Sequence, residues 1–216
     1  MRSARVPDFL PSRHGYAFAN RWPAGPAFEL GVRYLRIGIG ETAEGLCGGM
    51  CFSVADRFLR GEPRPEAGTA PVPGDPLFHE IARRQLDSLE LGRVPLRFWV
   101  AAARVRAGRW TARDQIREWL AARADIDAGR PAMLGLVRSA AVNPFALTHN
   151  HQVLAFAYQA EAASATIRVY DPNHPGRDDV DIRLSIADAA VVNLEQTTGE
   201  PLLALLRLPY RPPPTR

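Results

Sequence analysis

The order of the periodic patterns along the chain constrains the fold more than any other feature of the sequence. From about Gly48 to Gly129, most segments have apolar residues at helical spacing, whereas beyond Gly129 short apolar runs between Gly, Pro and Asp predict strands. A block of helices followed by a block of strands predicts an α+β fold. The chain has 216 residues, of which 46% are hydrophobic, so residues 1–216 are expected to form one domain.

The predicted elements divide this domain into a helical lobe over about 45–128 and a sheet lobe over about 129–209. A loose Pro-rich tail is predicted at 210–216. Residues 1–44 predict an extended arm or short strands, and the Pro- and Gly-rich stretch 61–76 predicts an irregular loop. The predicted helices cover 48–60, 77–91, 96–107 and 111–128, and the predicted strands cover 131–137, 152–158, 166–171, 179–184 and 201–208.

The composition argues against several classes of protein. The formal net charge is +4, and all 27 basic residues are arginines interleaved with acids, so no basic stripe predicts nucleic-acid binding. No run approaches the ~20 apolar residues that span a bilayer, and the amino terminus has no apolar signal core. The two cysteines lie too close together to predict the disulfide framework of a secreted domain. We therefore expect a cytoplasmic protein that binds neither nucleic acid nor membrane.

Three short motifs carry the residues of a thiol hydrolase in chain order. Cys47 stands at the predicted start of a helix, His151 at the start of a strand and Asp171 at the end of one. A helix N-terminus contributes at most about 2 kcal/mol, whereas lowering a thiol pKa from about 8.5 to about 4 requires roughly 6 kcal/mol. We therefore expect His151 to reach Cys47 and to cause most of the shift. The motifs are GLCGGMCF at 45–52, HNHQ at 149–152 and YDPN at 170–173.

The predicted strand pair brings an imidazole and a carboxylate together. If the strands at 152–158 and 166–171 pair about a turn centred near Glu161, His151 lies opposite Asp171, and opposed residues have Cβ atoms about 5 Å apart. Asp171 is then placed to orient the imidazole and to stabilise its protonated form. A second interpretation remains open, in which Asp171 only starts a turn before the proline that follows it.

The sequence leaves the choice of nucleophile open but favours Cys47. Gly48 and Gly49 follow it directly, and glycines there leave room for a substrate backbone to approach the thiol. Cys51, one helical turn further along, is then a buried apolar filler and the alternative nucleophile. A third interpretation makes both thiols buried and inert.

The motifs resemble those of the papain-like cysteine peptidase superfamily, and are most similar to its bacterial double-glycine-leader peptidases. The similarity covers about 41–60 and 149–173, where Asn150 and His151 precede an apolar strand and Asp171 precedes a proline. The resemblance implies a two-lobed fold in which the nucleophile helix packs against an antiparallel sheet lobe. It also implies hydrolysis or transfer of an acyl group from a peptide or protein substrate, through a thioester and without a cofactor or metal.

One position departs from the family pattern. Glu41 stands six residues before Cys47, where the family usually carries a glutamine whose amide stabilises the oxyanion. A carboxylate there would repel the developing negative charge, so backbone N–H groups would have to stabilise it instead. The departure leaves open that the chain is a non-catalytic papain-like binding module. Asn150 and Asn173 complete the candidate neighbours of the site.

A metal site is a further alternative. Cys47 and Cys51 form a C-x3-C pair, and His149 and His151 form an H-x-H pair, which together make a possible Cys2His2 set. The spacing is unusual for structural zinc, since two ligands would lie on a helix and two at the entrance of a strand. This alternative predicts a metal-binding protein rather than a hydrolase.

Overall fold

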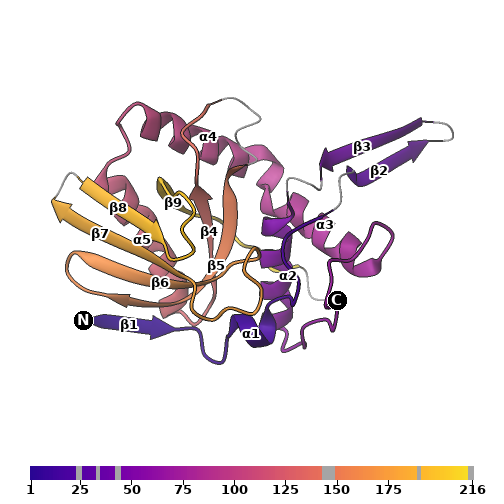
Figure 1. Cartoon of the computed structure of the whole chain (residues 1–216), viewed down its shortest axis with the longest axis horizontal. Coiled ribbons are helices and arrows are strands. Elements are labelled where there is room, and N and C mark those ends of the chain that lie inside the picture. The colour runs from indigo at the N-terminus through magenta and orange to yellow at the C-terminus, as the bar shows by residue number, and fades with distance from the viewer. Residues whose placement is uncertain (23–25, 33–34, 42–44, 143–148, 189–190, 214–216) are drawn as a thin grey trace.

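The structure, a computed structural model, describes residues 1–22, 26–32, 35–41, 45–142, 149–188 and 191–213. It confirms the predicted α+β class, because helices and antiparallel strands pack around a shared apolar core (Figure 1). The helices are α1 (Pro11–His14), α2 (Cys47–Leu59), α3 (Pro76–Ser88), the 3-10 turn η2 (Glu90–Gly92), α4 (Arg93–Arg106) and α5 (Ala112–Asp127). The strands are β1 (Arg2–Arg5), β2 (Pro26–Val32), β3 (Leu35–Glu41), β4 (Ala132–Val137), β5 (His151–Ala160), β6 (Ser164–Tyr170), β7 (Asp181–Asp188), β8 (Val191–Gln196) and β9 (Ala204–Arg207).

A curled antiparallel sheet of seven strands forms the centre of the molecule (Figure 1). Six strands run in the order β8-β7-β6-β5-β4-β9, and β1 pairs with the second half of β5, beyond the end of β4. All of β4 and the first six residues of β5 are buried, because α2 and α5 pack against these strands. Such strands read as continuous apolar runs in the sequence. β2 and β3 form a separate two-stranded sheet.

The start of α2 lies in the core, where α3 packs closely against it. The first ten residues of α2, from Cys47 to Asp56, are all buried. A Cβ on Gly49 would overlap the carbonyl oxygen of Ile81 and lie 2.8 Å from the backbone nitrogen of Gln85. The Gln85 Oε1 accepts a hydrogen bond from the Gly49 N–H at 2.7 Å, which satisfies a donor that has no partner within the helix. Glycine at this position therefore sets how closely the two helices approach.

Most of the elements predicted from periodicity are present. The four predicted helices are confirmed as α2 to α5, and the five predicted strands are confirmed as β4 to β7 and β9. The predicted arm at 1–44 contains β1, α1, β2 and β3, whereas β8 was not predicted. The predicted loop at 61–76 is irregular up to Asp75, where α3 is capped. α4 and α5 pack against β4 and β9, so part of the predicted helical lobe lies on the sheet.

Tyr210 and Arg211 are hydrogen bonded to buried side chains of α2 and α3, although the sequence predicted a loose tail at 210–216. The Tyr210 hydroxyl donates to Asp56 Oδ1 at 2.6 Å. Arg84, whose Nε lies 2.8 Å from Asp56 Oδ2, donates from Nη2 to the carbonyl of Arg211 at 2.9 Å. Asp56 and Arg84 are buried, so their polar atoms need partners, and the tail provides two of them. Residues 214–216 lie outside the described part of the chain.

Replacing Gly49 by alanine is expected to lower the free energy of unfolding by about 2–3 kcal/mol, because the new methyl group meets backbone atoms that cannot move aside. Denaturant unfolding followed by circular dichroism measures the change. Gly68→Ala is the matched control, since a Cβ there meets no atom within 4 Å. Equal stabilities of the two variants would contradict the close packing of α2 against α3.

Candidate active site

The first turn of α2 places Cys47 against the start of β5. Cys47 is the first residue of the helix and is buried, with 9% of its surface exposed. Its thiol lies close enough to the imidazole of His151 for each group to shift the pKa of the other, and the backbone N–H groups of Gly48 and Gln152 also lie near the sulfur. The structure therefore brings together a thiol and an imidazole that are far apart in the sequence.

The other side of the imidazole contacts Asp171. His151 Nε2 lies 2.7 Å from Asp171 Oδ1, and both side chains are buried. Because Nε2 is engaged by the carboxylate, Nδ1 is the ring nitrogen that faces Cys47. The predicted contact between His151 and Asp171 is present, and the ring is held between a carboxylate and a thiol.

The strand register that the sequence predicted for this contact is wrong. The turn lies at 161–164, where the Glu161 N–H donates to the Ser164 carbonyl at 2.8 Å, rather than being centred on Glu161. A β-bulge near Ala155 then shifts the pairing once more, so that Tyr170 pairs with Leu154. Continued along the strands, this register places residue 171 diagonally across from residue 151 instead of directly opposite. Diagonal neighbours have Cβ atoms about 7–8 Å apart, which an imidazole and a carboxylate can span.

Both oxygens of the Asp171 carboxylate have partners within the core. Oδ1 also accepts from the backbone N–H of Asn173 at 2.8 Å, and Oδ2 accepts from Gln196 Nε2 at 2.6 Å. Arg138 Nη2 lies 3.9 Å from Oδ2 and donates to Gln196 Oε1 at 3.0 Å. A fully buried carboxylate is tolerated only when donors and positive charge surround it. These contacts hold Asp171 in its ionised form and fix its direction toward His151.

The contacts shift three pKa values in directions that favour a thiolate and an imidazolium. Burial opposes ionisation of Asp171, but the charge of His151 and the hydrogen bonds to the carboxylate hold its pKa well below the usual range. Burial opposes protonation of His151, but the charges of Asp171 and Cys47 raise its pKa to about 9. Burial disfavours a thiolate at Cys47, but the His151 charge and hydrogen bonds from the ring and the backbone lower the thiol pKa below its ordinary value.

Cys51, the alternative nucleophile, lies one turn deeper in the core and is fully buried. Its thiol donates to the carbonyl oxygen of Gln152 at 3.5 Å. Burial, together with the negative charges of Cys47 and Asp171, raises the pKa of this thiol well above its ordinary value. The electrostatic environment therefore favours Cys47 over Cys51 as the reactive thiol.

The two glycines after Cys47 do not provide the open approach to the thiol that the sequence predicted. Both are buried, and a Cβ on Gly48 would overlap Ser88 Oγ and lie 2.8 Å from the side-chain amide of Gln152. The space next to Gly48 and Gly49 is filled by α3 and β5. Their small size therefore serves helix packing rather than substrate access.

Asn150, Asn173 and Glu41 are the other residues that the sequence predicted as neighbours of the site. Asn150 Oδ1 accepts from the backbone N–H of Arg138 at 3.2 Å, so it holds the end of β4 beside the start of β5. Asn173 contacts Asp171 through its backbone N–H, as described above. Glu41 is the last residue of β3, and its side chain lies outside the described part of the structure.

The Cys2His2 alternative is not supported by the positions of its four residues. In the ranges that the structure describes, no three His, Cys, Asp or Glu side chains are grouped so that they could hold a metal ion. Both cysteines are free thiols, and Cys47, Cys51 and His151 are buried while His149 is exposed.

Gln196 and Arg138 belong to the site but were not predicted from the sequence. Gln196 ends β8, a strand that the sequence did not indicate, and it lies 25 residues after Asp171. Arg138 follows β4 directly, and nothing distinguishes it from the other arginines of the chain. Only the sheet topology, which sets β8 and β4 on either side of the Asp171 carboxylate, identifies these two residues.

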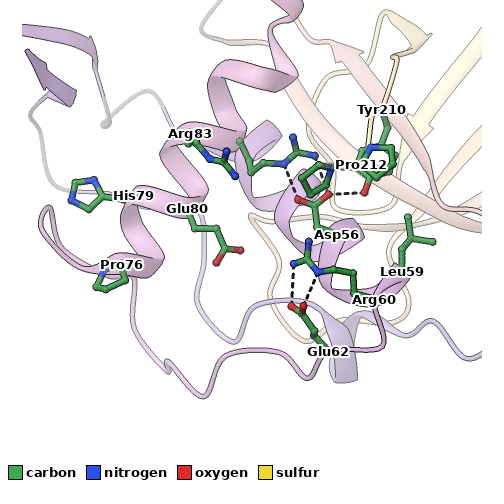
Figure 2. A pocket seen from close by; sticks show the side chains of 12 residues that line it. Asp56, Leu59, Arg60, Glu62, Pro76, His79, Glu80, Arg83, Tyr210 and Pro212 are labelled. Carbon is green, nitrogen blue, oxygen red and sulfur yellow. Dashed lines mark hydrogen bonds and ion pairs between the residues drawn. The ribbon is translucent and has the colours of Figure 1, made fainter. Parts of the chain in front are cut away.

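A cavity of about 1050 Å³ lies at the other end of α2 (Figure 2). Asp56 and Leu59 line it, together with Arg84 and with Tyr210 from the C-terminal tail. Asp56 forms an ion pair with Arg84, and Figure 2 shows the hydrogen bond from Tyr210 to Asp56. Asp56 comes nine residues after Cys47, which corresponds to about 13 Å along a helix. The cavity is therefore separate from the thiol and its imidazole.

Comparisons with known proteins assign no family to this geometry, because no family model, curated protein or solved structure matches the chain. None of the described helices is both long and apolar enough to cross a membrane. The chemistry of the site is therefore argued from the positions of its own residues.

Replacing Asp171 by asparagine is expected to raise the pKa of the Cys47 thiol, because the loss of the carboxylate charge lowers the His151 pKa and weakens the imidazolium that stabilises the thiolate. The rate of alkylation by iodoacetamide, measured against pH, should show a midpoint below about 8.5 in the wild type. In the variant the midpoint should rise by about one pH unit, which is a ~10-fold loss of thiolate at lower pH.

The matched control for Asp171→Asn is Asp178→Asn, which removes another hydrogen-bonded carboxylate. Asp178 accepts from the Ser12 N–H at 2.8 Å and from its hydroxyl at 2.6 Å, at the start of α1. This control should leave the midpoint unchanged. An Asp171→Asn profile that coincides with the wild-type profile would show that the carboxylate does not act on the thiol.

Proposed function

We propose that the chain is a thiol hydrolase or acyltransferase that acts on a peptide or amide bond. Cys47 is the nucleophile, His151 is the general base and later the general acid, and Asp171 orients the imidazole. The observation that carries the proposal is the arrangement of three buried groups: the Cys47 thiol lies beside the His151 imidazole, and the imidazole is hydrogen bonded to the Asp171 carboxylate. Burying three ionisable groups is costly unless they are paired, and perturbed pKa values of this kind cluster at reactive sites.

The proposal includes a papain-like, two-lobed arrangement. α2 begins at the nucleophile and packs against β5, the strand that begins at the base. The acid follows at the end of β6, the strand that pairs with β5. This order of nucleophile on a helix, then base and acid on an antiparallel sheet, supports the resemblance to papain-like peptidases that the motifs suggest.

In the acylation step, the Cys47 sulfur attacks the carbonyl carbon of the substrate. A carbon–sulfur bond forms, and the carbonyl π electrons move to the oxygen, whose negative charge is stabilised by the backbone N–H of Cys47 at the start of α2. The His151 imidazolium then gives its Nδ1 proton to the leaving nitrogen as the carbon–nitrogen bond breaks. A thioester on Cys47 and a free amine result, and the imidazole is left neutral.

In the second step, the neutral imidazole accepts a proton from the attacking nucleophile. Water gives hydrolysis, and an amine or alcohol gives acyl transfer. The nucleophile adds to the thioester, the carbon–sulfur bond breaks, and the thiolate and imidazolium are restored. Asp171 remains ionised throughout and stabilises the imidazolium whenever it forms. The steps need no cofactor, and the proposed partner is the peptide or protein substrate.

Replacement of Cys47 by alanine is expected to abolish covalent labelling by a thiol-directed acyl probe at neutral pH. The Cys51→Ala variant is the matched control and should retain labelling at the wild-type rate, because its buried thiol has a raised pKa. His151→Ala should slow labelling by about 10²-fold or more, since the general base and the imidazolium are lost together. Intact-protein mass spectrometry follows the added mass, and tandem fragmentation assigns the cysteine.

Three outcomes would count against the proposal. Labelling on Cys51 in the wild type would show that the nucleophile was assigned one turn too early. Unchanged labelling in His151→Ala would show that the imidazole does not activate the thiol. A wild-type protein that is not labelled, and whose thiol titrates near the ordinary value of about 8.5, would favour a non-catalytic binding module.

A further inference from the structure

Asn20 links two segments that carry the candidate catalytic residues. We name residues 45–47 the nucleophile segment and residues 171–173 the acid segment. The Asn20 side chain reaches the first, and both its backbone and its side chain reach the second. Asn20 lies 26 residues before the first contact and 153 residues before the last one. No step of the proposed reaction uses this residue.

The contact to the nucleophile segment is a short hydrogen bond. Asn20 Oδ1 accepts from the backbone N–H of Leu46 at 2.7 Å, and the same oxygen accepts from Trp22 Nε1 at 2.9 Å. Leu46 is the N-cap of α2 and has no side-chain hydrogen bond to the helix. Its carbonyl accepts the first helical hydrogen bond, from the Met50 N–H at 2.9 Å. Asn20 therefore restrains the residue from which the nucleophile helix starts.

The preceding residue, Gly45, allows the amide to lie this close. Gly45 has a φ of +92°, and a Cβ there would lie 2.6 Å from Asn20 Nδ2. Any other residue at this position would be strained and would also collide with the amide. The absence of a side chain at Gly45 thus leaves the space that the Asn20 amide occupies.

The contacts to the acid segment are two hydrogen bonds. The Asn20 backbone N–H donates to the Pro172 carbonyl at 2.9 Å, and Nδ2 donates to Asn173 Oδ1 at 3.3 Å. The backbone N–H of Asn173 in turn donates to the Asp171 carboxylate at 2.8 Å. Through this chain of contacts, Asn20 joins the start of α2 to the loop that holds the carboxylate.

We propose that Asn20 is a positioning residue that fixes the distance between the Cys47 thiol and the His151 imidazole by tying the nucleophile segment to the acid segment. The inference rests on the thiol chemistry proposed above and adds a residue to it. The imidazolium can stabilise the thiolate only while the two segments keep the ring beside the sulfur. A displacement of about 1 Å in an active site can cost about 10²-fold in rate.

The test is the pH dependence of Cys47 alkylation by iodoacetamide in the full chain. Asn20→Ala is expected to move the midpoint upward by about one pH unit and to slow alkylation at pH values below it by about 10-fold, because the imidazolium no longer stays beside the sulfur. Thermal unfolding of the same samples shows whether each variant is folded. Tandem mass spectrometry assigns the alkylated cysteine.

Gln115→Ala is the matched control, because Gln115 is also an amide that ties together two distant segments. Its Nε2 donates to the Leu205 carbonyl at 3.2 Å, and its Oε1 accepts from the Leu205 N–H at 3.0 Å, which joins α5 to β9. The control should lower the melting temperature and leave the alkylation midpoint unchanged. An equal shift in both variants would show general loosening of the fold and would overturn the positioning role.

A second variant tests the same link if Asn20→Ala does not fold. Asn173→Ala removes only the acceptor of the Asn20 Nδ2 bond and keeps the backbone N–H that binds Asp171. Its midpoint should move in the same direction by a smaller amount. If the wild-type midpoint is below about 8.5 and every folded variant has the same midpoint as the wild type, the role of Asn20 is overturned and the thiol chemistry stands. A wild-type midpoint near about 8.5 overturns both.

Discussion

The hydrogen bond between His151 and Asp171 inside the core is the contact on which the rest of the site depends. An ionised carboxylate with no exposed surface is costly, and the cost is offset only by the groups that surround it. The imidazole, the Asn173 N–H and the Gln196 amide provide direct hydrogen bonds, and Arg138 lies close by. Because the carboxylate stays charged, the imidazole beside it holds its proton, and that charge lowers the pKa of the Cys47 thiol.

The fold places His151 and Asp171 beside the N-terminus of α2. β5 and β6 carry the imidazole and the carboxylate at neighbouring ends, and β8 and β4 add the amide and the guanidinium around them. α2 packs against β5, and α3 and β5 fill the space beside the glycines of its first turn. The glycines that permit this packing also allow the Cys47 sulfur to lie beside the His151 ring. α2, α3 and the sheet together therefore fix the position of the thiol.

Periodicity in the sequence was sufficient to predict the class of fold, the four longer helices and five of the strands. The order of three short motifs, rather than periodicity, pointed to Cys47, His151 and Asp171, and the structure places these three side chains next to one another. Periodicity was insufficient for strand register, since the turn at 161–164 and the β-bulge depend on local hydrogen bonds that no apolar pattern encodes.

The groups that hold the site together escaped prediction for a related reason. Gln196 and Asn20 are single polar residues whose partners lie far away in the sequence, so their roles follow from topology alone. Gly48 and Gly49 were interpreted as space for a substrate, whereas α3 and the Gln152 side chain of β5 occupy this space. The sequence shows that small residues occupy these two positions, and only the structure shows which elements pack against them.

The most direct measurement of the central claim is the titration of the His151 ring by NMR, with its resonances assigned by their loss in a His151→Gln variant. The account predicts a pKa of about 9 for this ring, because the charges of Asp171 and Cys47 outweigh its burial. It also predicts a lower value once Cys47 is replaced by alanine. A ring that titrates near about 6.5 in the wild type, the ordinary value for histidine, or that is unaffected by the loss of the thiol, would contradict it.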